Sequence, residues 1–361
     1  MRVHIVGTGL IGTSLGLALR RAGVTVTLED PSPTAAALAR DLGAGDLDVP
    51  PDPDVVVIAA PPDVAAAAVA GALSRWPAAA VTDAASVKST VLSDLAATVA
   101  DQRDLSRYVG SHPMAGRERS GAVAAQVDLF DGRPWVLAPG PQAAERAVAA
   151  VARIGELVGS AVVRMTPAEH DAAVAAVSHV PQVAASLVAA RLRDLPGPAV
   201  SLSGQGIRDV TRIAASDPTM WTQILAGNAP AVSIVLRALR ADLDGILAAL
   251  DALSDVEGDG VGARAVLARA VADGNAGHAR IPGKHGSPPT AYASVVVVTP
   301  DAPGTLAKLL ADVADAGVNL EDLHLEHGIG QPFGLVEIVV VPAAAEPLTA
   351  ELTARGWRVH D

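Results

Sequence analysis

In Val3-His4-Ile5-Val6-Gly7-Thr8-Gly9-Leu10-Ile11-Gly12, a β-branched run passes directly into a G-x-G-x-x-G motif. Apolar residues at helical spacing follow as far as Arg21, so the stretch predicts a strand, a glycine turn and a helix. In such a unit the first glycine makes the tight turn, the second admits a pyrophosphate, and the third lets helix and strand pack closely. The stretch therefore predicts a dinucleotide-binding α/β fold, with the phosphates at the helix N-terminus.

An acidic residue follows this motif at the spacing of a ribose contact. The next predicted strand, Val24 to Leu28, ends in Glu29-Asp30, which places Asp30 18 residues after Gly12. A carboxylate there accepts hydrogen bonds from ribose hydroxyls and repels a 2′-phosphate, and no arginine follows in Pro31 to Thr34 to attract one. We expect NAD rather than NADP, bound through Gly7, Gly9, Leu10, Ile11, Gly12 and Asp30.

The strands continue in alternation with helical segments up to residue 166. Further strands are expected at Asp54–Ala60, Ala80–Asp83, Tyr108–Ser111, Arg133–Ala138 and Ala161–Met165. This alternation predicts a Rossmann-like, doubly wound sheet over residues 1–166. Ser86 follows one strand and His112 leaves the end of another, so both are expected at the carboxyl edge of the sheet, where ligands bind.

Strand patterns disappear after Pro167, and three further segments follow. Residues 167–274 carry Ala, Leu and Val at helical spacing, which predicts an all-α domain of roughly five helices. Residues 275–292 are rich in glycine, proline and basic side chains and predict a linker, whose basic residues 278–285 could fold over an acidic substrate. Residues 293–361 predict a ferredoxin-like βαββαβ module, with its second strand starting at Gly317–Leu320.

Composition excludes several classes of protein. The formal charge of −12 argues against a general nucleic-acid binder and against binding to an anionic membrane. The chain has no cysteine, so it has no disulfide or thiolate metal site, and no metal is expected. Charges, Gly and Pro interrupt the apolar runs, and the first residues lack a signal-peptide pattern. We therefore expect a cytoplasmic protein without a membrane span.

The best candidate for a proton acceptor lies in Gly110-Ser111-His112-Pro113-Met114-Ala115-Gly116. Histidine can take a proton near neutral pH. Pro113 biases His112 towards extended backbone, and the flanking glycines allow a ligand to approach closely. These features favour His112 as a catalytic base.

Taken in order, the motifs of the chain resemble those of the prephenate dehydrogenase family, followed by a C-terminal ACT domain. The resemblance covers nearly the whole length. It is carried by Gly7–Leu15, Thr82–Lys88, Gly110–Gly116, Leu129–Pro134, Ser178–Pro181, Arg208–Ala214 and Ser216–Trp221.

The resemblance implies NAD-dependent oxidative decarboxylation of prephenate to 4-hydroxyphenylpyruvate, in tyrosine biosynthesis. It implies that His112 takes the proton of the ring hydroxyl, that Ser86 hydrogen-bonds and orients His112, and that Arg212 holds a substrate carboxylate. His179 also matches a family position. Family members often carry a second, substrate-contacting histidine where this chain has Gln182.

Three other readings remain open at this point. Because Gln182 replaces a histidine, the substrate could be arogenate, which has an ammonium where prephenate has a keto group. The chain could instead be a catalytically silent NAD-binding amino-acid sensor, although the intact Ser86, His112 and Arg212 argue against this. A β-hydroxyacid dehydrogenase would use a lysine on its helical domain, and residues 167–255 contain none.

The resemblance also implies regulation. The segments Asp301–Leu306 and Gly317–Leu320 are similar to the ligand-binding signature of ACT domains. We expect tyrosine to bind near Gly304 and Asn319 in a homodimer.

Overall fold

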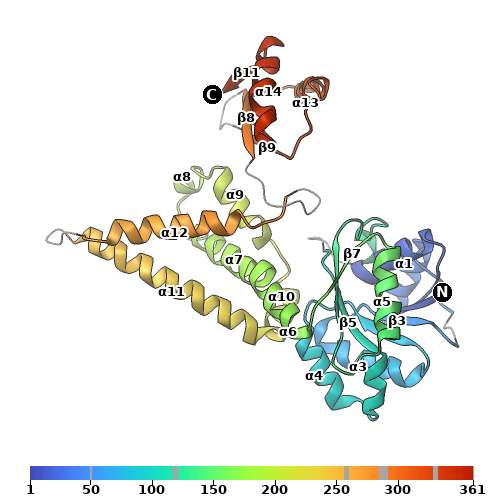
Figure 1. Cartoon of the computed structure of the whole chain (residues 1–361). Coiled ribbons are helices and arrows are strands. Elements are labelled where there is room, and N and C mark those ends of the chain that lie inside the picture. Colours follow the sequence, from blue (N-terminus) through green and yellow to red (C-terminus); the bar gives the residue numbers. More distant parts are fainter. Residues whose placement is uncertain (49–50, 117–120, 256–259, 284–291, 328–331, 361) are drawn as a thin grey trace. The chain divides into compact units, whose positions relative to one another are not determined.

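The computed structural model describes residues 1–48, 51–116, 121–255, 260–283, 292–327 and 332–360. The chain forms two compact units, Met1–Arg240 and Ala241–Asp361 (Figure 1). The four domain ranges predicted from the sequence stay predictions.

A seven-stranded sheet organises the first unit, in the order β2-β1-β3-β4-β5-β6-β7. Neighbouring strands are parallel except β5 and β6, which are antiparallel. The predicted Rossmann-like sheet is therefore confirmed. The strands are β1 (Arg2–Val6), β2 (Thr25–Glu29), β3 (Val55–Ile58), β4 (Ala80–Asp83), β5 (Tyr108–Pro113), β6 (Pro134–Ala138) and β7 (Ala161–Arg164).

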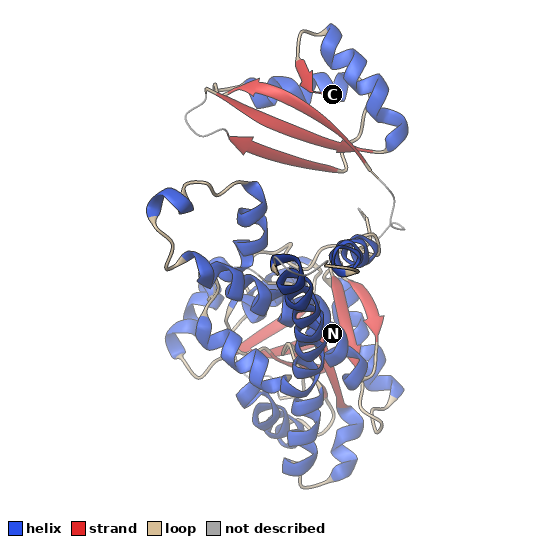
Figure 2. Ribbon diagram, turned by 90° about the vertical axis from the view of Figure 1, so that its left-hand side faces the viewer, coloured by secondary structure: helices blue, strands red, loops and turns tan. Residues whose placement is uncertain are grey.

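Helices cover both faces of this sheet, as Figure 2 shows for the red strands enclosed by blue helices. Buried side chains of α1, α2 and α5 pack with Val3, Ile5 and Leu28 on one face. Those of α3 and α4 pack with Val56 and Ile58 on the other. The bounds are α1 (Leu10–Arg21), α2 (Pro33–Asp41), α3 (Pro62–Arg75), α4 (Ser89–Thr98), η1 (Gln102–Arg107), η2 (Ala122–Ala124) and α5 (Glu145–Leu157).

The position of His112 differs slightly from the prediction. The sequence predicts that His112 leaves the end of a strand, whereas β5 continues through Pro113 and His112 pairs with Val136 of β6. The antiparallel partner extends the strand, because it supplies backbone hydrogen bonds beyond the end of the parallel pairing with β4. His112 is consequently held by a strand rather than by a loop.

More helices follow β7 than the five predicted. The glycine- and proline-containing segments near residues 195–204 include short helices, which the sequence pattern does not distinguish from loops. Asp217 caps α10, since its side chain accepts from the Thr219 N–H and Pro218 occupies the first turn. The elements are α6 (Pro167–Val174), the π-helical turn η3 (Ala175–His179), α7 (Val180–Leu192), α8 (Gly197–Val200), α9 (Gln205–Thr211), η4 (Arg212–Ala214), α10 (Pro218–Gly227), α11 (Ala229–Ser254) and α12 (Ala263–His278).

The sequence predicts no membrane span, whereas one helical stretch is long and apolar enough to cross a membrane, by length and composition alone. Within the described ranges, α6, η3 and α7 run on as one helical stretch of 26 residues, Pro167–Leu192, which contains an 18-residue window of mean hydropathy 1.5. Pro181 does not interrupt it, because proline is tolerated in the first turn of α7. The same stretch also carries the polar residues His170, Asp171 and His179, whose side chains are buried inside the first unit.

The C-terminal unit contains a four-stranded antiparallel sheet in the order β11-β8-β10-β9, with α13 and α14 packed on one face. Gly317–Leu320 lies before the second strand rather than in it, because the strand begins at Asp322. Helix α12 continues to His278, which lies within the predicted linker range 275–292; Lys284 and His285 lie outside the described residues. The elements are β8 (Ala293–Pro300), α13 (Thr305–Asp315), β9 (Asp322–His327), β10 (Phe333–Val340), α14 (Pro342–Ala354) and β11 (Arg358–His360).

Candidate active site

The glycine loop has the shape that a dinucleotide needs. Gly7 has φ +101°, and a Cβ there would lie 2.4 Å from the Ala59 carbonyl oxygen. A Cβ on Gly12 would lie 1.8 Å from the Gly7 oxygen, whereas a Cβ on Gly9 would meet no atom within 4 Å. Gly7 and Gly12 are thus required by packing, and the space beside Gly9 is open. No side chain caps the start of α1, so the N–H groups beginning at Leu10 and Ile11 are available to phosphate oxygens.

Asp30 is held beside this loop. Its Oδ2 accepts from the Thr8 N–H at 2.7 Å and the Thr8 hydroxyl at 2.9 Å, and its Oδ1 accepts from the Ser32 N–H at 2.8 Å. A carboxylate offers about four acceptor positions, so Oδ1 retains capacity for a ribose hydroxyl. The geometry fits NAD at this end of the sheet.

Asp30→Asn should lower kcat/KM for NAD⁺ by about 10–100-fold, the usual value of a hydrogen bond to a charged group, and should reduce the preference for NAD⁺ over NADP⁺. Glu29→Gln is the matched control, because Glu29 is a neighbouring carboxylate that is bound instead by Arg75 at 2.9 Å. Steady-state kinetics with both cofactors measures the effect. Equal use of NADP⁺ by the unmodified protein would contradict the role of Asp30.

His112 is joined to a second histidine and a carboxylate. Its Nδ1 lies 2.9 Å from Nε2 of His170, whose Nδ1 lies 2.8 Å from Oδ1 of Asp171. His170 and Asp171 are buried on α6, and His112 is half-buried on β5. A chain of three side chains therefore connects the carboxyl edge of the sheet to the helices that follow it.

The carboxylate determines which nitrogen of each ring carries a proton. An ionised carboxylate only accepts, so Asp171 takes the proton-bearing Nδ1 of His170. In neutral His170 the Nε2 then accepts, which makes Nδ1 of His112 the donor. Nε2 of His112 is left with a free lone pair, and no described residue hydrogen-bonds to it. The lone pair on Nε2 of His112 is thus available to accept a proton.

The surroundings keep His112 neutral. Burial lowers the pKa of His112 well below its ordinary value, and electrostatic interactions with His170, Lys88 and His179 lower it further, against an opposing contribution from Asp171. Burial alone would raise the pKa of Asp171, but hydrogen bonds from His170, Ser89 and Lys88 lower it. The base is therefore neutral, and its carboxylate partner ionised, at neutral pH.

A buried lysine fixes the backbone just before His112. Lys88 Nζ donates to Asp83 Oδ1 and, at 2.7 Å, to the Ser111 carbonyl oxygen. The Tyr108 hydroxyl donates to the other Asp83 oxygen at 2.6 Å. The lysine and aspartate side chains are both fully buried. Satisfying every group of such a cluster rigidifies it, and this one places a positive charge near His112.

Asp171 also ties α6 to the start of α4. Its two oxygens accept from the Lys88 N–H at 2.9 Å and the Ser89 N–H at 2.8 Å. Asn228 donates one amide proton to the Asp171 carbonyl oxygen at 2.8 Å and the other to Nδ1 of His179 at 3.1 Å. His179 therefore accepts at Nδ1 and carries its proton on Nε2.

The other predicted site residues differ in how deeply they are buried and in whether they have a hydrogen-bond partner. Ser86 is half-buried in the loop after β4, and no hydrogen bond joins it to His112 among the described residues, where Nδ1 of His112 pairs with His170. Gln182 is buried one helical turn after His179, and its Oε1 lies 3.5 Å from the Ser216 hydroxyl. Arg212 is exposed on η4 and forms no ion pair within the described part of the chain.

Several residues that build the site were not among the predicted site residues. His170 and Asp171 follow Glu169 in a short polar cluster of an otherwise Ala- and Val-rich segment. Asp83 and Lys88 stood inside a quoted motif, in an otherwise apolar strand and its exit. Charged residues in a strand that is otherwise apolar signal a paired cluster, and this signal could have found them; Asn228 had none.

Comparison with known proteins agrees with this geometry. Residues 15–164 match the family model of the prephenate dehydrogenase nucleotide-binding domain, and residues 166–257 match that of the prephenate dehydrogenase dimerization domain. A probable prephenate dehydrogenase, NovF of Streptomyces niveus, is 40% identical over 359 residues, which is 98% of each chain. The chain belongs to the prephenate dehydrogenase family.

Two solved structures of such enzymes are similar in fold. The prephenate dehydrogenase of A. aeolicus, crystallised with hydroxyphenyl propionate and NAD⁺, has a TM-score of 0.66 and 27% identity, covering 78% of this chain and 98% of that one. The arogenate dehydrogenase of Synechocystis has a TM-score of 0.63 and 26% identity, covering 76% of this chain and 99% of that one. This prephenate dehydrogenase family member thus resembles enzymes named for either substrate.

Proposed function

We propose that the protein is an NAD-dependent prephenate dehydrogenase that converts prephenate to 4-hydroxyphenylpyruvate and CO₂. The observation that carries the proposal is the His112–His170–Asp171 chain, which presents a neutral imidazole Nε2 at the carboxyl edge of the sheet that also carries the loop shaped for a dinucleotide. Bound NAD⁺ supplies the two-electron oxidant. Family membership and the NAD⁺ complex of the A. aeolicus relative support this reading.

The residues of the chain have separate tasks in this reaction. His112 Nε2 takes the proton of the ring hydroxyl as the carbinol carbon is oxidised to a ketone. The ketone withdraws electrons from the ring, so the ring carboxylate leaves as CO₂ and the ring becomes aromatic. His170 and Asp171 stabilise the imidazolium that forms, because each donates or accepts along the same chain.

Substrate anions require a cation, for which we propose Arg212. Its guanidinium can bind a carboxylate through two parallel hydrogen bonds, and it is exposed without an ion-pair partner among the described residues. His179, through its Nε2–H, and Gln182 are the proposed neutral contacts to the substrate.

Arg212→Ala should raise KM for the substrate about 10–100-fold and leave KM for NAD⁺ within about twofold, because the loss of a charged hydrogen-bond partner is expected to be confined to the substrate. Arg212→Lys should rescue only in part, since lysine lacks the planar fork. Arg193→Ala is the control, an exposed arginine paired with its neighbour Asp194. An unchanged substrate KM would place the carboxylate elsewhere, with Arg280 or Lys284 as the next candidates.

Arogenate is the competing substrate. Gln182 is uncharged where related enzymes often carry histidine, and the similar Synechocystis structure is named an arogenate dehydrogenase. Side-by-side turnover, followed by NADH absorbance and product identification, separates the two. We expect a higher kcat/KM with prephenate; a higher value with arogenate would contradict the proposal, and no turnover with either would favour the silent sensor.

For the rest of the chain we propose a homodimer regulated through its C-terminal unit. The helices of residues 167–240 expose large apolar side chains, including Val177 (70% exposed) and Leu202 (84%), which suits a buried interface between two copies. The order βαββαβ is that of an ACT domain, and tyrosine binding near Gly304 and Asn319 stays a prediction. A cytoplasmic location likewise stays a prediction.

A further inference from the structure

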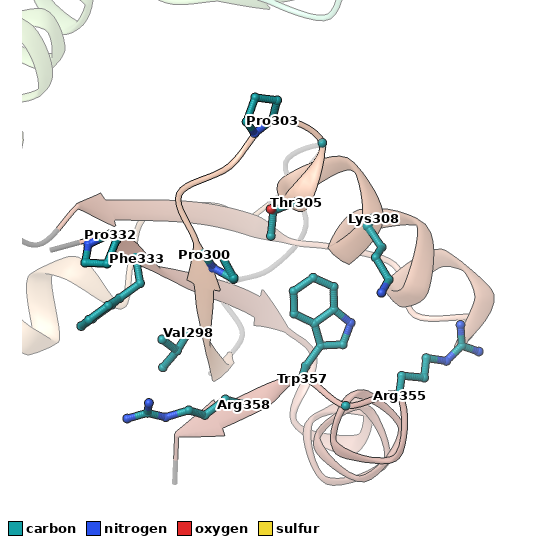
Figure 3. A pocket seen from close by; sticks show the side chains of 12 residues that line it. Val298, Pro300, Pro303, Thr305, Lys308, Pro332, Phe333, Arg355, Trp357 and Arg358 are labelled. Atoms are coloured by element: carbon teal, nitrogen blue, oxygen red, sulfur yellow. The ribbon is translucent and has the colours of Figure 1, made fainter.

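The C-terminal unit contains a cavity of about 750 Å³ at one end of its sheet. Binding sites for small molecules commonly have volumes of about 300–1,000 Å³. The cavity lies where β8, α13 and β11 meet (Figure 3). Of the two residues near which tyrosine is expected to bind, Gly304 lines the cavity and Asn319 does not. The lining residues that matter here are Gly304, Thr305, Lys308, Phe333, Trp357 and Arg358.

The charge of the lining is one-sided. Its ionisable side chains, among the described residues, are Lys308, Arg355 and Arg358, in a chain whose formal charge is −12. Arg355 is already neutralised by Asp312 at 2.9 Å, Asp315 at 3.2 Å and Glu351 at 2.8 Å. Lys308 and Arg358 form no ion pair within the described ranges. The cavity therefore presents two cations without an ion-pair partner, although Lys308 also interacts electrostatically with Asp312.

The indole of Trp357 forms an aromatic wall of the cavity and is held in place. The Trp357 N–H donates to Asp312 Oδ2 at 2.7 Å, and Lys308 Nζ lies 5.6 Å from the centre of the indole ring. In Figure 3 the indole lies between Thr305 and Lys308 of α13 on one side and Val298 and Arg358 of the sheet on the other. A ligand ring can stack on this fixed indole, and its anionic group can then reach a cation.

We propose that this cavity binds an aromatic carboxylate that lacks an ammonium group, of the arylpyruvate or arylpropionate class. The Trp357 indole accounts for the ring, and Lys308 and Arg358, which form no ion pair in the described ranges, account for the carboxylate. An α-ammonium is disfavoured, because no carboxylate lines the cavity among the described residues and the nearby Asp312 is engaged by Trp357 and Arg355. The inference goes beyond the proposed reaction and concerns a site in a different unit of the chain.

Calorimetric titration of the full chain, saturated with NAD⁺, with 4-hydroxyphenylpyruvate tests the proposal. We expect two molecules bound per chain, one in the catalytic site and one in the cavity. In Lys308→Gln combined with Arg358→Gln, the cavity component should weaken at least about tenfold, because two charge-assisted contacts are removed. Lys308→Arg combined with Arg358→Lys should retain it to within about threefold, and kcat should stay unchanged in both.

The controls separate this site from the others. Arg146→Gln, which removes an exposed charge from α5, should leave both components unchanged. Tyrosine should occupy the cavity at least about tenfold more weakly than the keto acid. A single binding event that survives the Lys308 and Arg358 substitutions would overturn the proposal, as would tyrosine binding to the cavity as tightly as the keto acid. If the protein does not oxidise prephenate, the proposed function is wrong, but binding of 4-hydroxyphenylpyruvate that depends on Lys308 would still support the cavity proposal.

Discussion

Replacing His112 with asparagine should lower kcat by about 10²–10⁴-fold, the usual contribution of a positioned general base. Asparagine keeps a side-chain amide near the Nδ1 position, so the hydrogen bond to His170 can persist while the lone pair at Nε2 is lost. KM for NAD⁺ should stay within about twofold, because the glycine loop and Asp30 are untouched. Steady-state kinetics at saturating substrate measures both quantities.

The pH profile of the unmodified enzyme provides an independent check. His112 acts as a base only when neutral, and burial lowers its pKa well below the ordinary 6.5. The acid limb of kcat/KM should therefore lie at lower pH than a free imidazole would give. From the sequence alone a near-neutral value would be expected, and the structure corrects it. A retained turnover in His112→Asn, or an acid limb above 6.5, would show that another group takes the proton.

Asp171→Asn should be nearly as damaging as His112→Asn, at about 10²–10⁴-fold in kcat. The asparagine amide would donate to Nδ1 of His170, which forces the proton of His170 onto Nε2. Nδ1 of His112 must then accept, and its own proton moves to Nε2, where the base needs a lone pair. The wrong tautomer is thus propagated through two rings.

Glu169→Gln is the matched control for this substitution. Glu169 precedes the pair in the sequence but caps α6 through Thr166, at 2.8 Å, and does not contact the histidines. Its replacement should leave kcat within about twofold. A thermal midpoint for Asp171→Asn is also needed, because Asp171 accepts two backbone N–H groups of the α4 N-terminus. A folded Asp171→Asn enzyme with unchanged kcat would contradict the tautomer argument.

The fold follows closely from local sequence patterns. The G-x-G-x-x-G turn, the apolar strand Val55–Ile58 and the Asp217-Pro218 cap each depend on neighbours within a few residues, so they can be read directly. The short helices near Gly197 and Gln205 could not be separated, because glycine and proline mask them. The π-helical turn at Ala175–His179 gives no signal in a pattern based on 3.6 residues per turn.

In the site, too, some residues can be predicted from local sequence patterns and others cannot. Asp30 is recognisable because it follows a strand at the spacing of a ribose contact, and His112 because it lies next to a proline in a glycine-flanked segment. The hydrogen bond between His112 and His170 spans 58 residues, and that between Lys88 and Asp171 spans 83. Contacts at such separations depend on how the helices dock onto the sheet, which composition and spacing do not encode. The expected role of Ser86 as the partner of His112 stays a prediction.

A double-mutant comparison tests the central claim, that His112, His170 and Asp171 act as one proton-accepting unit. It measures kcat for NADH formation from prephenate in His112→Asn, in Asp171→Asn and in the double variant. Residues that act as a unit are strongly non-additive, so the double variant should be no more than about threefold slower than His112→Asn alone. If the two separate losses multiply instead, Asp171 acts independently of the base, and the account of the site is wrong.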